Sequence, residues 1–295
     1  MRGEQEDMEH RSAFLLLGLA ALVALLVTIY QPVLFPGERL VPPVLPTEDA
    51  MARPRVLTFC SDPWPPYAGT AGTASEGYVV DLLRAIFEPQ GFEVRYSSMA
   101  WSRCIQETRD GRFLGLLCCE RHETPDFTFP QEPVGITSPS FFTLPDSTWT
   151  WQGTPSLDLI RLGMVQDYYY CDALEEYVRE HRHSARVVLT QGTEALERLL
   201  GLLETGTIDA FVENGVVVDH LLASQASPTR RLRCAGRIEP GGILYVGFSP
   251  RDPRSHDISR RFDEGMRRLR QDGTLARILA RAGVADWLSS ATVSP

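Results

Sequence analysis

The chain has 295 residues, of which 43% are hydrophobic and 23% are charged, and its net charge is −9. This length and composition indicate a globular protein that can bury a sizeable core, in one large domain or two smaller ones. The acidic charge argues against broad nucleic-acid binding, which needs a basic surface. Because the sequence contains no lysine, a Schiff-base lysine and a phosphate-loop lysine are excluded.

The first predicted element is an apolar, uncharged run at residues 13–30, which is long enough to span a bilayer core. Arg2 and Arg11 precede the run, and no small-residue cleavage site follows it directly. Residues 1–30 therefore predict a signal anchor or a cleaved signal peptide, that is, an N-terminal transmembrane or signal helix. Residues 31–54 hold six prolines without an apolar period, which predicts an extended Pro-rich linker.

From Arg55 onward, short apolar runs alternate with amphipathic segments. The order strand, helix, strand, helix, strand predicts a parallel sheet with helices on its faces. The predicted strands are 55–59, 92–98 and 113–118, and the predicted helices are 76–91 and 101–111.

The same alternation restarts after residue 160, with strands at 161–166, 185–190 and 208–214 and helices at 171–181 and 194–206. An extended crossing and a polar loop at 140–156 lie between the halves. A strand at 241–250 returns, and two amphipathic helices close the chain. This pattern predicts an α/β fold of two lobes joined by two hinge strands, with a ligand in the cleft at the carboxyl ends of strands.

Several motifs carry a resemblance in this order: PWPPY at 63–67, EGYVVDLLRAI at 76–86, DFTFP at 126–130, SLDLIRLGMVQDYYY at 156–170 and LETGTIDAFVEN at 203–214. With the helix beginning at Trp101 and the closing helix pair, the chain from 55 to 287 resembles the family 3 bacterial periplasmic solute-binding proteins of the polar amino-acid type. The resemblance implies the periplasmic binding protein type II fold. We expect 55–143 to form the first part of lobe 1, 144–248 lobe 2, and 249–295 the C-terminal part of lobe 1.

The resemblance implies an extracytoplasmic protein that closes two lobes around a small polar, carboxylate-bearing ligand, an amino acid or a related organic acid. Its role would be transport or sensing, with an inner-membrane permease or a sensor as partner and without a cofactor or a metal. We expect it at the periplasmic face of the inner membrane, anchored by residues 13–30, or soluble in the periplasm after cleavage.

The resemblance also implies site residues. Arg121 stands five residues before Asp126, where the family places the arginine that clamps the ligand's carboxylate, and a guanidinium suits that task. The alternative is that this loop is shorter than in the family and Arg121 is simply exposed. Cys118 occupies the position of a hydroxyl residue. Asn214, preceded by Glu213, stands where the family has the aspartate that pairs with an α-ammonium group, so an ordinary α-amino acid is doubtful.

Other candidates follow from residue chemistry. Trp64 and Tyr67 are candidate walls of the cleft, and Asp62 is placed to meet a cationic group, although loop packing and a solvated turn are the alternatives. The segment Asp167, Tyr168, Tyr169 and Tyr170 precedes a predicted helix, where free backbone N–H groups receive anions. We expect at least one of these tyrosines to reach the cleft.

An enzyme on the same scaffold, similar to the cyclohexadienyl dehydratases, is the alternative function. A dehydratase needs a general acid and a general base, for which Glu120, His122, Glu123 and Glu213 are candidates. No recognisable catalytic arrangement links these four residues.

The six cysteines allow three further hypotheses. A metal site at Cys118, Cys119, His122 and Glu123 is disfavoured because adjacent cysteines rarely reach one tetrahedral ion. A reactive thiol needs a base and an orienting group. The only support for it is that His122 lies nearby in the sequence. A disulfide of Cys60 with Cys118 or Cys119 would join the ends of two neighbouring predicted strands.

Overall fold

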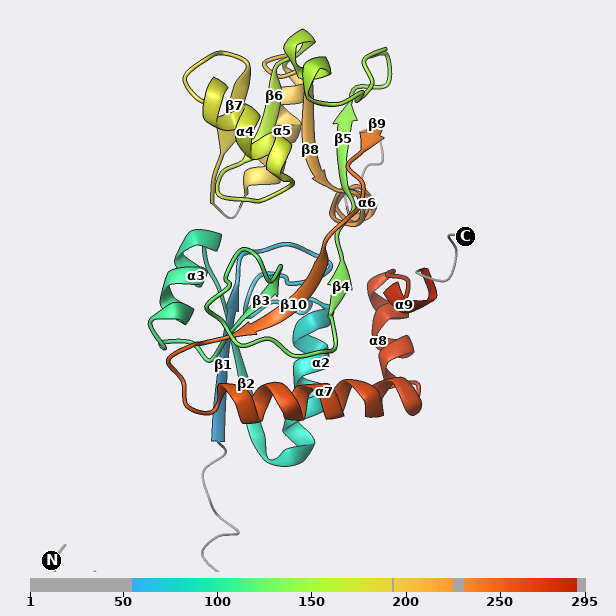
Figure 1. The fold of residues 1–295 in the computed structure, drawn as a ribbon. Coiled ribbons are helices and arrows are strands. Elements are labelled where there is room, and N and C mark those ends of the chain that lie inside the picture. Colours follow the sequence, from blue (N-terminus) through green and yellow to red (C-terminus); the bar gives the residue numbers. More distant parts are fainter. Residues whose placement is uncertain (1–54, 193, 225–230, 291–295) are drawn as a thin grey trace, which may run out of the picture. The chain divides into compact units, whose positions relative to one another are not determined.

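The computed structural model describes residues 55–192, 194–224 and 231–290 (Figure 1). The predicted signal helix and the Pro-rich linker lie outside these residues. Among the helices that the structure does describe, none is both long and apolar enough to cross a membrane.

The first sheet has the strand order β2-β1-β3-β10-β4. β1 is parallel to both β2 and β3, whereas β10 is antiparallel to β3 and β4. The strands are β1 (Arg55–Ser61), β2 (Phe92–Ser98), β3 (Gly115–Cys119), β4 (Gly135–Ile136) and β10 (Ile243–Phe248). The parallel pairs confirm the predicted α/β character of this lobe.

Helices cover both faces of the first sheet because side chains alternate along its strands. Leu57 and Phe59 of β1 face a large core, whereas Cys60 faces a smaller cluster. The large core contains α2 (Tyr78–Phe87), α7 (Ser255–Gln271) and α8 (Thr274–Ala282), and the smaller cluster contains α3 (Trp101–Arg109). A 3₁₀ turn (Glu88–Gln90) follows α2, and α9 (Trp287–Ser290) ends the described chain.

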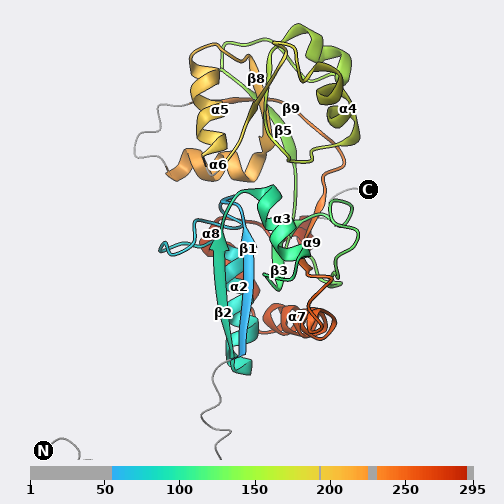
Figure 2. The ribbon, with the colours of Figure 1, turned by 90° about the vertical axis from the view of Figure 1, so that its left-hand side faces the viewer.

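The second sheet has the order β7-β6-β8-β5-β9. β6 is parallel to β7 and β8, and β5 is antiparallel to β8 and β9. Its strands are β5 (Pro139–Thr143), β6 (Leu162–Val165), β7 (Val187–Thr190), β8 (Ala210–Asn214) and β9 (Arg233–Arg237). Its helices are the 3₁₀ helix Thr154–Leu159, α4 (Asp172–His181), α5 (Ala195–Glu204) and α6 (Gly215–Ser224). Figure 2 shows α4 on one side of this sheet and α5 and α6 on the other.

Two short segments connect the sheets, between β4 and β5 and between β9 and β10. They are hydrogen-bonded to each other: Thr137 N–H donates to the carbonyl of Gly242 at 2.8 Å, and Gly242 N–H donates to Thr137 Oγ1 at 2.7 Å. The chain changes sheet before β5 and before β10, earlier than the expected lobe boundaries at 143/144 and 248/249. The apolar pattern of 139–143 predicts a strand, but it does not say which sheet that strand joins.

Candidate functional site

A cavity of about 50 Å³ lies where strands of both sheets end. Four carboxylates line it: Asp62, Glu120, Glu123 and Glu213. Five aromatic side chains line it as well: Trp64, Trp101, Tyr168, Tyr169 and Tyr170. The remaining lining residues are Ser61, Cys118, Thr137, Pro139, Asn214 and Leu244.

The loop after β1 supplies the first aromatic wall. Trp64 stacks on Tyr67 with ring centroids 4.7 Å apart. Tyr67 is buried and its hydroxyl donates to the carbonyl of Ile136 at 2.8 Å. Tyr67 therefore supports Trp64 from behind and does not itself line the cavity.

The loop after β6 brings the tyrosines to the cavity. Asp167 has φ 65°, a left-handed conformation that turns the chain, and its exposed side chain does not line the cavity. Tyr168, Tyr169 and Tyr170 all line it. The Tyr170 hydroxyl is buried, and no group in the described chain meets it with normal hydrogen-bond geometry.

The end of β8 supplies two buried side chains, Glu213 and Asn214. Strand alternation predicts that they point to opposite faces, yet both line the cavity. The strand ends here: the Asn214 N–H donates to Glu213 Oε1 at 2.6 Å, and Asn214 Oδ1 accepts from the N–H of Val216 at the start of α6. Local hydrogen bonding at the strand end thus brings both side chains to one site.

Three hydrogen bonds join the two lobes at this site. Trp64 Nε1 donates to Glu213 Oε1 at 3.1 Å, and Asn214 Nδ2 donates to the Tyr67 hydroxyl at 3.2 Å. The Tyr168 hydroxyl donates to Asp62 Oδ2. The cavity is therefore enclosed by side chains of both lobes that bond directly to each other.

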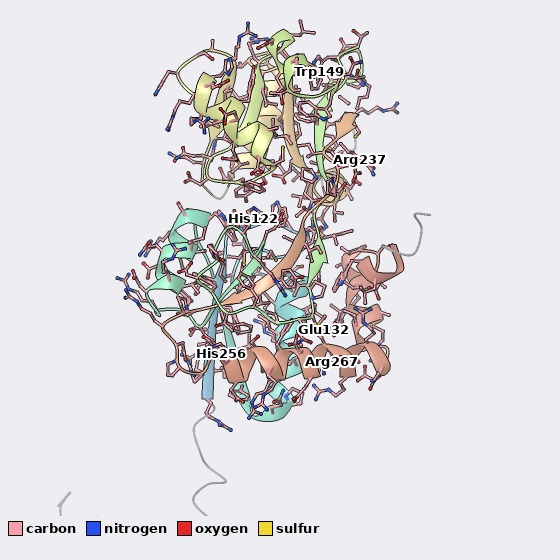
Figure 3. The ribbon with its side chains drawn as sticks, in the orientation of Figure 1. His122, Glu132, Trp149, Arg237, His256 and Arg267 are labelled. Carbon is pink, nitrogen blue, oxygen red and sulfur yellow. The ribbon has the colours of Figure 1, made fainter. Side chains whose placement is uncertain are left out.

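A contact between two rings also joins the lobes, at the rim of the cavity. The centroids of His122, labelled in Figure 3, and Tyr169 lie 4.1 Å apart. His122 is exposed, and its Nδ1 lies 3.6 Å from Glu120 Oε2. His122 therefore links the carboxylate of one lobe to a tyrosine of the other.

The electrostatics of the cavity are set by burial. Loss of hydration raises the pKa of Asp62 to about 6 and the pKa values of Glu123 and Glu213 to about 7. Burial also raises the pKa of Glu120. No arginine is among the lining residues of the described chain. Asp62, Glu123 and Glu213 accept hydrogen bonds from neutral donors, whereas Glu120 lies beside the imidazole of His122.

Arg121, the predicted carboxylate clamp, is exposed and does not line the cavity. Its guanidinium donates to the carbonyl of Pro130 at 2.7 Å and lies 4.2 Å from the centroid of the Tyr245 ring. Cys118 does line the cavity, with φ 64° at the end of β3. Because its thiol is buried, its pKa is raised well above the usual value, and it is a weak hydrogen-bond partner.

All six cysteines are free, so the predicted disulfide of Cys60 with Cys118 or Cys119 is absent. The three sulfur atoms have different neighbours. Cys60 Sγ lies 3.3 Å from Thr108 Oγ1 on α3, Cys119 Sγ approaches the carbonyl of Tyr245 on β10, and Cys118 faces the cavity. Across the described ranges, no three His, Cys, Asp or Glu side chains are grouped so that they could hold a metal ion.

The structure therefore places seven predicted site residues at the cavity: Asp62, Trp64, Cys118, Tyr168, Tyr169, Glu213 and Asn214. Tyr67, Arg121 and Asp167 do not line it. The sequence interpretation assigned no binding role to Trp101, Thr137 or Leu244, and it treated Glu120 and Glu123 only as candidate catalytic or metal residues. Among these five residues, only two had a sequence feature that could have indicated a place at the cavity. Trp101 begins a helix motif, and Glu123 lies three residues from Glu120 in an acidic loop.

Comparison with known proteins identifies the architecture. Residues 57–284 match the model of the bacterial extracellular solute-binding proteins, family 3. A histidine kinase sensor domain with similarity to periplasmic binding proteins is 24% identical, with a TM-score of 0.64 over 78% of this chain and 96% of that chain.

Two further solved structures have the same fold. An amino-acid ABC transporter substrate-binding protein from Streptococcus pneumoniae, bound to L-arginine, is 15% identical, with a TM-score of 0.62 over 79% of this chain and 97% of that one. A Salmonella typhimurium periplasmic binding protein with high arginine specificity is 12% identical, with a TM-score of 0.60 over 77% and 99%. A search of curated proteins found no match.

Proposed function

Since this chain belongs to the bacterial extracellular solute-binding proteins of family 3, we propose that it binds one small polar solute between its two lobes. The observation that carries this proposal is the cavity whose walls come from both sheets. A solute held there contacts both lobes and stabilises the closed arrangement, which is how hinged binding proteins report a ligand.

The two connecting segments support a hinge. Both cross between the sheets near Thr137 and Gly242, and their two mutual hydrogen bonds keep them side by side. A rotation at this point separates Trp64 from Glu213 and Tyr168 from Asp62, while each sheet stays intact. Closure therefore costs few contacts within either lobe.

The solute would be passed to a transporter or reported to a sensor. Solved structures with this fold include both a transporter's substrate-binding protein and a kinase sensor domain. The periplasmic anchor at residues 13–30 and an inner-membrane permease or sensor partner stay predictions from the sequence. An anchored receptor suits both roles, because a permease and a sensor partner would both lie in the membrane.

The carboxylate on the ligand also stays a prediction from the resemblance. It depends on Arg121, whose guanidinium is held by Pro130 and Tyr245 away from the cavity lining. The lobe-closure proposal does not depend on the ligand's charge, because neutral, cationic and anionic solutes all bridge two lobes in the same manner.

A thermal-shift screen of amino acids, dicarboxylates, polyamines, small amines and aromatic acids tests the proposal, because binding to the native state raises the melting temperature. X-ray scattering with and without each hit should show a more compact protein with ligand. Trp64→Ala should remove both responses, whereas Asp209→Asn, on the surface of the second lobe, should retain them. A hit that leaves the scattering unchanged contradicts lobe closure.

The same hits separate a receptor from an enzyme. We expect each ligand to be recovered unchanged by mass spectrometry after prolonged incubation. Turnover that is lost in Glu123→Gln or Glu213→Gln would favour the dehydratase-like alternative.

A further inference from the structure

Building on the proposed function, we propose that the cavity takes a small organic cation, an ammonium or guanidinium compound without a carboxylate. The proposal names the ligand class of the site, and it departs from the carboxylate clamp that the resemblance implies. It rests on four observations: the charge of the lining, the donors that meet its carboxylates, the aromatic walls and the available volume.

The first observation is the charge of the lining. Asp62, Glu120, Glu123 and Glu213 all face one cavity of about 50 Å³, and no arginine of the described chain joins them. Like charges this close repel one another, and burial makes each harder to ionise. A cation that enters the cavity relieves both costs at once, whereas a carboxylate adds a fifth negative group.

The second observation is how these carboxylates are held. Asp62 accepts from the Tyr168 hydroxyl, and Glu213 accepts from Trp64 Nε1 and from the N–H of Asn214. Glu123 Oε2 accepts from the N–H of Glu120 at 2.7 Å. Neutral donors fix the positions of these three carboxylates without cancelling their charge, and a carboxylate has about four lone-pair sites to share. The fourth, Glu120, lies 3.6 Å from His122 Nδ1. Acceptor capacity therefore remains for a donor-rich cation.

The third observation is the aromatic lining. The Tyr168 ring meets Trp64 edge to face, with centroids 6.5 Å apart, and Trp101, Tyr169 and Tyr170 also line the cavity. Aromatic faces attract ammonium and guanidinium groups, most strongly where water is excluded.

The fourth observation is size. A cavity of about 50 Å³ accommodates roughly three to five water-sized groups. This volume suits a small cationic head group such as an alkylammonium or a guanidinium. A bare metal ion is not favoured, since the described residues contain no group of three metal-ligating side chains.

Matched pairs of probes that differ by a carboxylate test the proposal: agmatine against L-arginine, choline against glycine betaine, and ethanolamine against glycine. Isothermal titration calorimetry with the full-length chain gives the dissociation constant of each probe. We expect at least one carboxylate-free member to bind about tenfold or more tightly than its partner. Glutamate and a neutral sugar serve as further probes.

Two variants with the same change of charge in the second lobe sharpen the test. Glu213→Gln should weaken the best probe by about 100-fold, because a desolvated ion pair is lost. Asp209→Asn removes a carboxylate that is paired with Arg161 on the surface, and it should change the affinity less than twofold. Circular dichroism checks that both variants fold.

Tighter binding of the carboxylate-bearing member in every pair overturns the cation proposal and leaves the receptor function standing. Exclusive binding of glutamate or of the sugar has the same consequence. Equal weakening by Glu213→Gln and Asp209→Asn overturns it as well, since the effect would then be one of overall charge. If no probe binds and the wider screen also yields no hit, the receptor function fails together with the cation proposal.

Discussion

Carboxylates on the surface of this protein and carboxylates in its cavity have opposite electrostatic surroundings. On the surface, Asp126 receives two hydrogen bonds from Arg109, at 2.8 and 3.1 Å, and Asp209 is paired with Arg161 in the same way. The arginine hydrogen bonds lower the pKa values of both aspartates. In the cavity, Asp62 and Glu213 meet only neutral donors, and burial raises their pKa values.

This contrast indicates where the protein leaves charge unneutralised. The chain has 29 arginines and no lysine, and Arg121, in the loop that carries Glu120 and Glu123, donates to Pro130 and lies over the ring of Tyr245. A buried carboxylate without a cation costs stability. A ligand that supplies the missing charge recovers that cost only when it is bound, which makes the cavity selective for cations.

The largest expected effect comes from removing the buried charge itself. Burial raises the pKa of Glu213 to about 7 from an ordinary 4.5, so the folded protein holds a proton there that the unfolded chain has lost. The free energy of unfolding therefore falls as pH rises from about 4.5 to about 7. In the absence of ligand, Glu213→Gln should be more stable than the parent by about 3 kcal/mol at pH 8 and no more stable at pH 4.

Urea unfolding at both pH values measures this difference. Asp209→Asn provides the control, because its carboxylate has a lowered pKa and its loss should cost stability at pH 8. A Glu213→Gln protein that is destabilised at pH 8 would show that the ionised carboxylate stabilises the empty fold.

The next effect is the pH dependence of cation binding. Because a cation favours the ionised carboxylates, binding should release about one to two protons near pH 6, so that affinity falls about tenfold to hundredfold per pH unit below that. Calorimetry in buffers of different ionisation enthalpy counts these protons. The titratable groups at or beside the cavity are Asp62, Glu120, Glu123, Glu213, Cys118, Tyr168, Tyr169, Tyr170 and His122. Affinity that stays constant from pH 5 to 8 would contradict a role for these carboxylates.

A smaller effect is expected at the crossing segment. A Cβ atom built on Gly242 would lie 1.9 Å from Glu120 Oε1, so Gly242→Ala must push that carboxylate aside. We expect cation affinity to fall about threefold to tenfold, by roughly 1 kcal/mol, with little change in melting temperature. Glu120→Gln should give a similar loss, and the two changes combined should be less than additive because both act on the same carboxylate.

The smallest effect should come from a surface pair. Arg109→Ala removes the ion pair with Asp126, and both side chains are at least a third exposed. We expect a loss of about 0.5 kcal/mol that shrinks at high salt, measured by urea unfolding at two ionic strengths. A fall in the free energy of unfolding of more than about 2 kcal/mol would contradict the view that surface ion pairs contribute little to stability.

The sequence was most informative about features that depend on a single helix, strand or loop. Period-two and helical patterns predicted the alternation of strands and helices, and aromatic residues after β1 and β6 predicted cavity walls that Trp64 and Tyr168 provide. Trp101 was missed because it reaches the cavity from a helix whose orientation depends on packing against β1 and β3. Arg121 shows the limit of motif spacing: its position matches the family clamp, but the ring of Tyr245, 124 residues later in the chain, receives its guanidinium.

The pairing of β5 with β9 has a consequence for the order of assembly. All five strands of the second sheet come from the unbroken stretch 139–237, and Ser140 at its start pairs with Arg237 at its end. The first sheet needs β10, which pairs with β3 more than 100 residues away. Once the inserted lobe has folded, its ends lie together, so the loop that β3 and β10 must close is effectively short. The second lobe can thus complete its sheet first, and its paired ends then hold β3 and β10 close enough together to complete the first sheet.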